Sequence, residues 1–251
     1  MGKAEKDGIH MIGYFIFDDI DTRNYEGIVV TEVDVDSAPE RVYEEVIVAG
    51  RSGTILMDMK RYDNVVHSYD VVVYDDYVDN LVELRNDLLS KVGYHTLTDS
   101  FNTDEKYLAT VYASISPNQK IQRNGGYLHV EFSRKPQRYL ISGETEQIFS
   151  SSGSIVNPTK FGSRPMLVVS GLGILTIGNY TLEILGVAGQ TIYIDCDTME
   201  AWEVVGQGKI SRNDYIRNAG EEFPVIAPDS NVVTLGTGIT QVKITPRWWR
   251  L

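Results

Sequence analysis

Only one segment of this 251-residue chain, residues 77–91, repeats apolar side chains at helical spacing. Its stripe consists of Leu81, Leu84, Leu88 and Val92, and Leu89 widens it. Side chains three and four residues apart share one face of a helix, so we expect this helix to cover one face of a sheet. Asp75 or Asp76 is placed to cap its start, and Gly93 to end it. The other apolar runs lack this spacing, which predicts a mainly β chain.

Extended runs surround the helix in the first half of the chain. They are rich in β-branched and aromatic residues, and one of them alternates apolar and polar side chains from Val30 onward. The predicted strands cover residues 27–36, 42–49, 54–58, 69–74, 106–116 and 127–134. Together with the helix, they predict a β-rich α+β domain.

The pattern of apolar and loop-forming residues changes after Lys135-Pro136. Loop residues at 150–154 and 157–158 precede a series of short apolar runs that glycines separate. The runs cover residues 166–170, 174–177, 181–185, 191–195, 201–205, 231–235 and 240–245. Short strands with turn signals at intervals of about 8–12 residues predict an antiparallel β-sandwich. We therefore expect two domains, residues 1–136 and 137–251, with a last strand that can return toward the first domain.

The net charge of −12 is concentrated in the first domain. Residues 1–136 contain 14 basic and 24 acidic residues, which gives −10, and the remainder contributes −2. Affinity for nucleic acid comes chiefly from Lys and Arg on phosphates, so this balance argues against tight binding of DNA or RNA. An acidic wall is suited to let DNA pass without adhering to it.

Cysteine content and hydropathy point to a protein made and assembled in a cytoplasm. Cys196 is the single cysteine, so no intrachain disulfide forms, and we expect its thiol to be a small buried group. Residues 1–8 are charged and lack the apolar run of a signal peptide, and no stretch of about 18 apolar residues predicts membrane insertion.

Patterns of catalytic or metal-binding residues are weak throughout. The histidines His10, His67, His95 and His129 stand far apart, with no second ligand at metal spacing. The acidic pairs Asp18/Asp19, Asp75/Asp76 and Asp195/Asp197 lie beside predicted turns or the helix start, where carboxylates have structural roles. No serine lies in a Gly-x-Ser-x-Gly elbow. We expect no catalytic residues, metal or cofactor, and therefore not an enzyme.

Several segments, in order along the chain, form a recognisable series of motifs. One is the glycine–arginine–x–glycine loop at Gly50-Arg51-Ser52-Gly53, and another is the Phe132-Ser133-Arg134-Lys135-Pro136 exit from the first domain. The others are residues 15–20, 57–64, 93–100, 163–171, 194–195 before Trp202, 222–225 and 228–233. Together these segments resemble the distal tail protein family of long-tailed, non-contractile bacteriophages. Asp229 stands where the family usually has glycine, which leaves the type of that turn open.

The resemblance implies a virion structural protein at the tail tip. It implies a homo-hexameric ring of first domains around a channel for DNA, alone or as two stacked rings, with galectin-like sandwiches projecting outward. The implied partners are the major tail tube protein above, the tail-tip hub or tail-associated protein below, and receptor-binding proteins at the rim. It implies no catalytic residues and a role in host adsorption.

Two small groups of residues are candidates for contacts between proteins. Arg51, with Gly50 and Gly53 on either side, could reach a carboxylate of a neighbouring subunit or remain a solvated loop. Trp248 and Trp249 are costly to expose, so they are either packed within this chain, which we favour, or docked on a partner.

A carbohydrate-binding module that recognises host cell-wall glycan through the second domain is the alternative function. Such a site needs an exposed aromatic platform beside polar side chains, and Trp202 is the tryptophan that lies within the predicted sandwich strands. The sequence has no His-x-Asn-Pro-Arg run, of which Asn157-Pro158 keeps only the centre.

Overall fold

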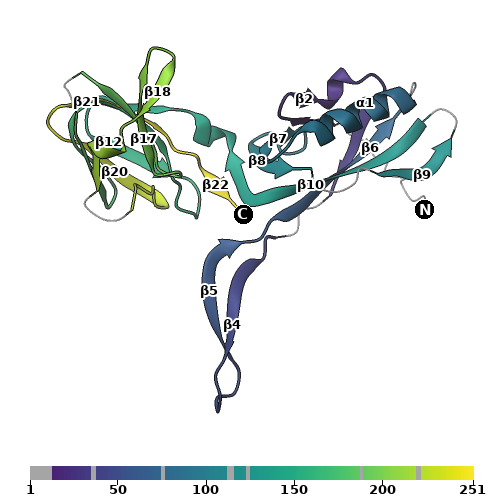
Figure 1. The fold of residues 1–251 in the computed structure, drawn as a ribbon, viewed down its shortest axis with the longest axis horizontal. Coiled ribbons are helices and arrows are strands. Elements are labelled where there is room, and N and C mark those ends of the chain that lie inside the picture. Colours follow the sequence, from purple (N-terminus) through teal and green to yellow (C-terminus); the bar gives the residue numbers. More distant parts are fainter. Residues whose placement is uncertain are drawn as a thin grey trace, which may run out of the picture. The chain divides into compact units, whose positions relative to one another are not determined.

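The computed structural model describes residues 13–34, 38–74, 77–111, 116–122, 125–186, 189–218 and 222–251. The chain divides into two compact units, Met1–Arg138 with Leu251, and Tyr139–Arg250. The division falls two residues after the boundary expected at Pro136. The mainly β fold class, with one α-helix among the described residues, is confirmed (Figure 1).

The first unit is built on one large sheet. Its strands lie in the order β2-β1-β7-β8-β10-β6-β3, and β9 pairs with β10 beside this path. They are β1 (Phe15–Phe17), β2 (Ile20–Asp21), β3 (Ile28–Val33), β6 (Val65–Val73), β7 (His95–Asp99), β8 (Glu105–Thr110), β9 (Ser116–Gln122) and β10 (Gly125–Leu140), with a 3-10 turn η1 (Thr22–Asn24). β10 is longer than the predicted strand and continues through Pro136.

The helix α1 (Tyr77–Ser90) covers one face of this sheet, as expected (Figure 1). Leu81, Leu84 and Leu88 are buried in the core that the sheet and the helix share. The prediction was wrong at the end of the stripe, because the helix stops at Ser90 and the next turn does not form. Val92 therefore lies beyond the helix and is 89% exposed, and Leu89, inside the helix, is 47% exposed because it lies on the side away from the core. Gly93 follows with φ of 91°, and Asp75 and Asp76 lie outside the described residues.

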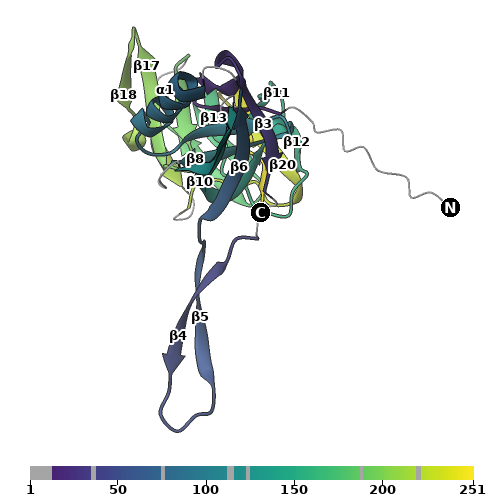
Figure 2. The same cartoon turned by 90° about the vertical axis from the view of Figure 1, so that its right-hand side faces the viewer.

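A separate two-stranded hairpin, β4 (Arg41–Ile47) and β5 (Thr54–Tyr62), leaves the first unit next to β6. Figures 1 and 2 both show it extending beyond the sheet. Its residues are exposed or half-buried along its whole length. The predicted strands 42–49 and 54–58 correspond to its two arms, but their sequence gave no sign that they pair only with each other.

The second unit is an antiparallel sandwich of two sheets, in the orders β11-β21-β13-β16-β17-β18 and β12-β20-β14-β15-β19. The strands are β11 (Gln147–Phe149), β12 (Gly153–Asn157), β13 (Met166–Gly171), β14 (Gly173–Ile177), β15 (Tyr180–Ile184), β16 (Thr191–Asp195), β17 (Glu200–Val205), β18 (Gly208–Ser211), β19 (Ile216–Asn218), β20 (Asp229–Leu235) and β21 (Ile239–Thr245), with 3-10 turns η2 (Ile141–Glu144) and η3 (Asn213–Tyr215). The short last strand, β22 (Trp249–Arg250), belongs to neither of these sheets and pairs with β10. Inward side chains of both sheets form one core.

Two local features of the sandwich depend on its tertiary contacts. Ser154 and Asn157, expected in loops, belong to β12, which pairs with β20 over its full length. Asp229, the residue that departs from the family's glycine, has φ of 66°, in the left-handed region that favours glycine. The Asn231 side chain fixes this turn by donating to the Asp229 carbonyl at 3.1 Å and accepting from the Ala227 N–H at 3.1 Å.

Candidate assembly surface

The hairpin β4–β5 presents exposed apolar side chains to solvent on both of its faces. Residues directly opposite each other in an antiparallel pair share a face, and here Glu44 pairs with Met57 and Val46 with Ile55. Alternation along each strand adds two further residues to this side. We call the set Val42, Val46, Ile55, Met57 and Met59 the hairpin's apolar face, and Glu44 is the charged residue among them. An isolated two-stranded hairpin is marginally stable in water, so this face is suited to be covered by another protein surface.

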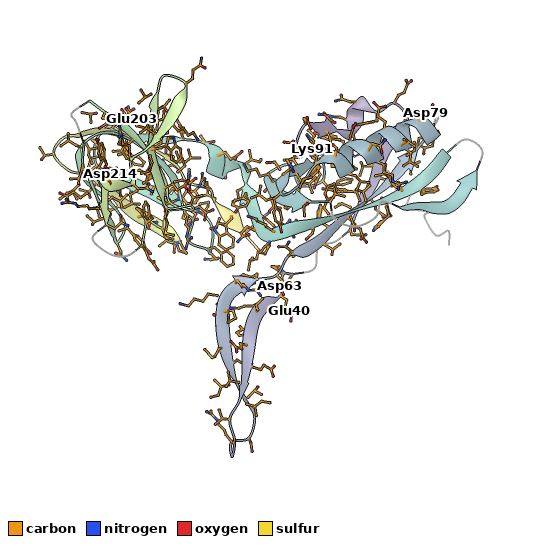
Figure 3. The ribbon with its side chains drawn as sticks, in the orientation of Figure 1. Glu40, Asp63, Asp79, Lys91, Glu203 and Asp214 are labelled. Carbon is orange, nitrogen blue, oxygen red and sulfur yellow. The ribbon has the colours of Figure 1, made fainter. Side chains whose placement is uncertain are left out.

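The base of the hairpin is fixed by polar contacts. The Arg41 guanidinium donates to both carboxylate oxygens of Asp58, through Nε at 3.0 Å and through Nη2, and it reaches the Tyr62 hydroxyl at 3.0 Å. This pair, with the Lys60 N–H that Asp58 also accepts, lowers the pKa of Asp58 to about 2. Lys60 has φ of 55° at a bulge in the ladder. Figure 3 labels Glu40 and Asp63, where the Asp63 N–H donates to the Glu40 carbonyl at 2.9 Å.

The tip of the hairpin contains the candidate contact residue Arg51. Arg51 is exposed and makes no ion pair with any residue in the described part of the chain. Gly50 and Gly53 have φ of 78° and 81°, and nothing lies within 4 Å of an added Cβ at either one. The glycines therefore serve the turn and not a close approach, and a neighbour for Arg51 would have to come from another chain.

The solvent face of β3, β6 and β10 carries an acidic cluster that the sequence analysis missed. Glu32, Asp70 and His129 lie in one row across the three strands, and Glu131 is paired with Ser68 in the next row. The Asp34 carboxylate accepts from the Ser68 hydroxyl. His129 Nδ1 lies 2.8 Å from Asp70 Oδ1, and its Nε2 lies 3.5 Å from Glu131 Oε1. In the sequence, these residues appear only as polar positions that alternate with apolar ones in three separate strands. The pairing that brings the three strands together could not be predicted from that pattern.

This cluster predicts a measurable change in the titration of His129. Asp70 raises the pKa of His129 above the usual 6.5, Glu131 and Asp34 act in the same direction, and burial opposes them. Since the folded-state pKa is raised, this contact stabilises the fold below pH about 6.5 and is lost as the pH rises through the folded-state pKa. We expect Asp70→Asn to lower the pKa of His129, measured by NMR titration of its ring protons, and Asp79→Asn, on the exposed start of α1, to leave it unchanged. An unaltered titration in Asp70→Asn would contradict the assignment.

The paired tryptophans near the C-terminus have different environments. Trp248 is 3% exposed and lies in the core of the sandwich. Trp249 is half-buried, stacks on Phe161 with ring centroids 4.5 Å apart, and donates from Nε1 to the Gly162 carbonyl at 3.0 Å. Both therefore pack within the second unit. The Trp248 carbonyl accepts from the Leu140 N–H at 2.8 Å, where β22 lies beside the end of β10.

The described carboxylates Asp18, Asp19 and Asp195 and the histidine His67 have structural partners, and Asp75 and Asp76 lie outside the described residues. Asp195 accepts two hydrogen bonds from Arg247, at 2.7 and 2.9 Å. Asp18 and Asp19 both contact Lys91, which Figure 3 labels at the end of α1. His67 is buried against the Tyr69 hydroxyl at 2.8 Å. No group of metal-ligating side chains occurs among the described residues, and His10 lies outside them. Cys196 is buried, which raises the pKa of its thiol.

Trp202 lies on the sandwich surface and is half-buried. Its ring stacks with Tyr193, with centroids 5.9 Å apart and planes inclined by 12°. The Lys209 ammonium lies over the Trp202 ring, 4.6 Å from its centroid. A sugar would have to displace this lysine to stack there, so the pair is a weak platform for carbohydrate.

The helix of the first unit is too short and polar to cross a membrane, and no other helix in the described ranges qualifies.

Comparison with known proteins identifies the fold. No protein-family model matches the chain, and no curated protein matches it. Among solved structures, the Dit protein of phage SPP1, described as a paradigm of the hub adsorption apparatus in phages that infect Gram-positive bacteria, aligns over 96% of this chain and 100% of its own, with 13% identity and a TM-score of 0.69. A chain of the phage p2 baseplate in its activated conformation aligns over 96% and 98%, with 10% identity and a TM-score of 0.50. The chain has the fold of a distal tail protein, which confirms the resemblance at the level of fold.

Proposed function

We propose that this chain is a structural protein of a phage tail tip that assembles with copies of itself into a hexameric ring. The observation that carries the proposal is the match to the SPP1 Dit fold over nearly the whole of both chains, including both units. The ring would join the tail tube to the tail-tip hub and support adsorption to the host. This role requires no catalysis, and the described carboxylates Asp18, Asp19 and Asp195 have structural partners.

The hairpin supports self-association. It places apolar side chains such as Met57 and Leu56, 52% and 57% exposed, on strands that have no other cover among the described residues. A ring of identical subunits needs two different surfaces on each copy, because every subunit contacts one neighbour on each side. The hairpin is suited to be one of them.

The acidic face of the sheet supports a channel for DNA. Glu32, Asp34, Asp70 and Glu131 lie on the side of the sheet opposite the core, in the unit whose sequence has a net charge of −10 over residues 1–136. If this face lines the ring, like charges keep DNA from adhering to the wall during passage. A ring whose lumen is neutral or basic would contradict this part of the proposal.

The further partners follow from the proposed position. The major tail tube protein would contact one side of the ring and the hub or tail-associated protein the other, with receptor-binding proteins attached at the rim. We propose assembly in the cytoplasm of the host bacterium and a final location in the virion tail tip. The second unit, an antiparallel sandwich, would be available for contacts outside the ring.

Mass photometry and negative-stain microscopy of the purified protein test the ring. We expect particles of about 170 kDa, six copies of the 28.2 kDa chain, or twice that mass for two stacked rings, with a central hole. Limited trypsin digestion gives a second measurement, because Arg51 is exposed in the monomer and is expected to become protected on assembly. Solitary particles at every concentration, with no closed assembly in the virion, would overturn the proposal.

A further inference from the structure

Two charged side chains of the first unit, Glu44 and Arg85, lie beside exposed apolar side chains and make no ion pair among the described residues. Glu44 lies within the hairpin's apolar face, between the pair Val46 and Ile55 on one side and Val42 and Met59 on the other. It makes no ion pair with any residue in the described ranges. A lone carboxylate at the centre of an apolar surface is suited to a cationic partner, because covering the face without one would bury an uncompensated charge.

The second surface is the outer side of α1. Val82 and Leu89 are 49% and 47% exposed, and they lie seven residues apart on one side of the helix. Arg85 is exposed between them, and it too has no ion pair within the part of the chain that the structure describes. We call Val82, Arg85, Leu89 and Val92 the outer face of α1.

Val92 is held in its exposed position. Lys91 Nζ lies 2.9 Å from Asp18 Oδ2, and His95 Nδ1 lies 3.4 Å from the same oxygen. His95 Nε2 also lies 3.1 Å from the Val92 carbonyl oxygen. Contacts on both sides of Val92 therefore fix the backbone that presents it, and a preorganised apolar side chain costs less entropy to dock.

We propose that the hairpin's apolar face of one copy docks on the outer face of α1 of a neighbouring copy, with Glu44 paired to the neighbour's Arg85. This inference rests on the proposed self-assembly. In each face a single charge lies beside apolar side chains, and the two charges have opposite signs; the outer side of α1 also presents the exposed Asn86. Their lengths are similar: the four residue steps from Val42 to Val46 along the strand span about 13 Å, and the seven steps from Val82 to Leu89 along the helix span about 10 Å.

The contact is heterologous, since a strand face of one copy meets a helix face of the next. Such a contact leaves the complementary surface of each copy available for another subunit, and repetition closes a ring when the rotation per subunit is suitable. The pair Glu44–Arg85 would set the register of the two faces, and the apolar residues around it would exclude water.

Charge reversal in the full-length protein tests the pairing. We expect Glu44→Arg and Arg85→Glu each to raise the subunit concentration at half-assembly roughly tenfold or more, because each places like charges together in a desolvated contact. The double variant Glu44→Arg/Arg85→Glu should recover most of the wild-type assembly. Glu45→Arg is the matched control, because Glu45 is the next residue but lies on the opposite face of the same hairpin. Mass photometry over a concentration series gives the readout, and circular dichroism checks that each variant is folded.

A cross-link provides an independent measurement. Met57→Cys combined with Leu89→Cys should give disulfide-linked oligomers under mild oxidation, while each single cysteine variant should not, and the native Cys196 is 1% exposed. If the wild type forms rings but the double charge variant is not rescued and no cross-link forms, the pairing is overturned and the ring proposal survives. Loss of assembly in Glu45→Arg equal to that in Glu44→Arg would also overturn it. A wild type that never assembles overturns both.

Discussion

Replacing Arg138 by methionine is expected to lower the free energy of unfolding of the first unit by about 2–4 kcal/mol. Arg138 donates from Nε to Glu105 Oε2 at 2.7 Å, and the Glu105 side chain is 0% exposed. The Tyr107 hydroxyl donates to the same oxygen at 3.1 Å. Methionine keeps most of the volume of the arginine stem but removes the guanidinium from a fully buried carboxylate, which is costly in a low-dielectric surrounding.

The matched control is Arg61→Met, which removes an ion pair of similar length from the surface. Arg61 Nη1 lies 2.9 Å from Asp63 Oδ1, with both side chains more than half exposed. Exposed pairs contribute about 0–1 kcal/mol, so we expect little change. The double variant Arg138→Met/Glu105→Gln should regain part of the loss, because a buried amide costs less than a buried carboxylate. Denaturant unfolding measures these values, and a change below about 0.5 kcal/mol in Arg138→Met would contradict this account.

Replacing Trp248 by alanine is expected to destabilise the second unit by about 3–5 kcal/mol. Trp248 belongs to the core that both sheets of the sandwich share, and the cavity left by its ring cannot collapse fully. Its backbone is also fixed by a close approach: a Cβ on Gly143 would lie 2.3 Å from the Trp248 nitrogen. The segment therefore has little freedom to move into the vacated space.

Trp249→Ala provides the comparison within the same dipeptide. Trp249 remains partly exposed, so its loss removes one ring stack and one hydrogen bond, for which we expect about 1–2 kcal/mol. Differential scanning calorimetry of the full chain should show the transition of the second unit shifted strongly by Trp248→Ala and weakly by Trp249→Ala. Equal shifts would mean that the core does not extend to Trp248 as described.

Part of the fold could be predicted because burial follows short-range periodicity. Leu81, Leu84 and Leu88 repeat at helical spacing and are buried on one side of α1. The glycine-separated runs from Met166 to Thr245 became strands because each alternates or clusters β-branched residues between turns. The boundary expected at Pro136 rested on a change in the spacing of these runs.

Other features could not be predicted, because they depend on which segments meet. Leu89 and Val92 are apolar like the buried leucines, but Leu89 lies on the side of α1 that faces away from the core, and Val92 lies beyond the end of the helix at Ser90. Ser154 and Asn157 are typical loop residues, and the ladder with β20 makes them part of a strand. Of the candidate contact residues, Arg51 was recognised from its motif, but Glu44 and Arg85 carry no motif at all.

The sequence by itself determined the mainly β character of the chain, its single described helix and its two-part organisation, since these depend on the order of side chains within about ten residues. Only the tertiary structure decided that β4 and β5 stand apart as a hairpin and that one tryptophan of an adjacent pair is core and the other is not. It also gathered Glu32, Asp70, His129 and Glu131 on one face. The physical reason is that pairing between strands distant in sequence determines which neighbours each side chain contacts. Local periodicity does not encode that pairing.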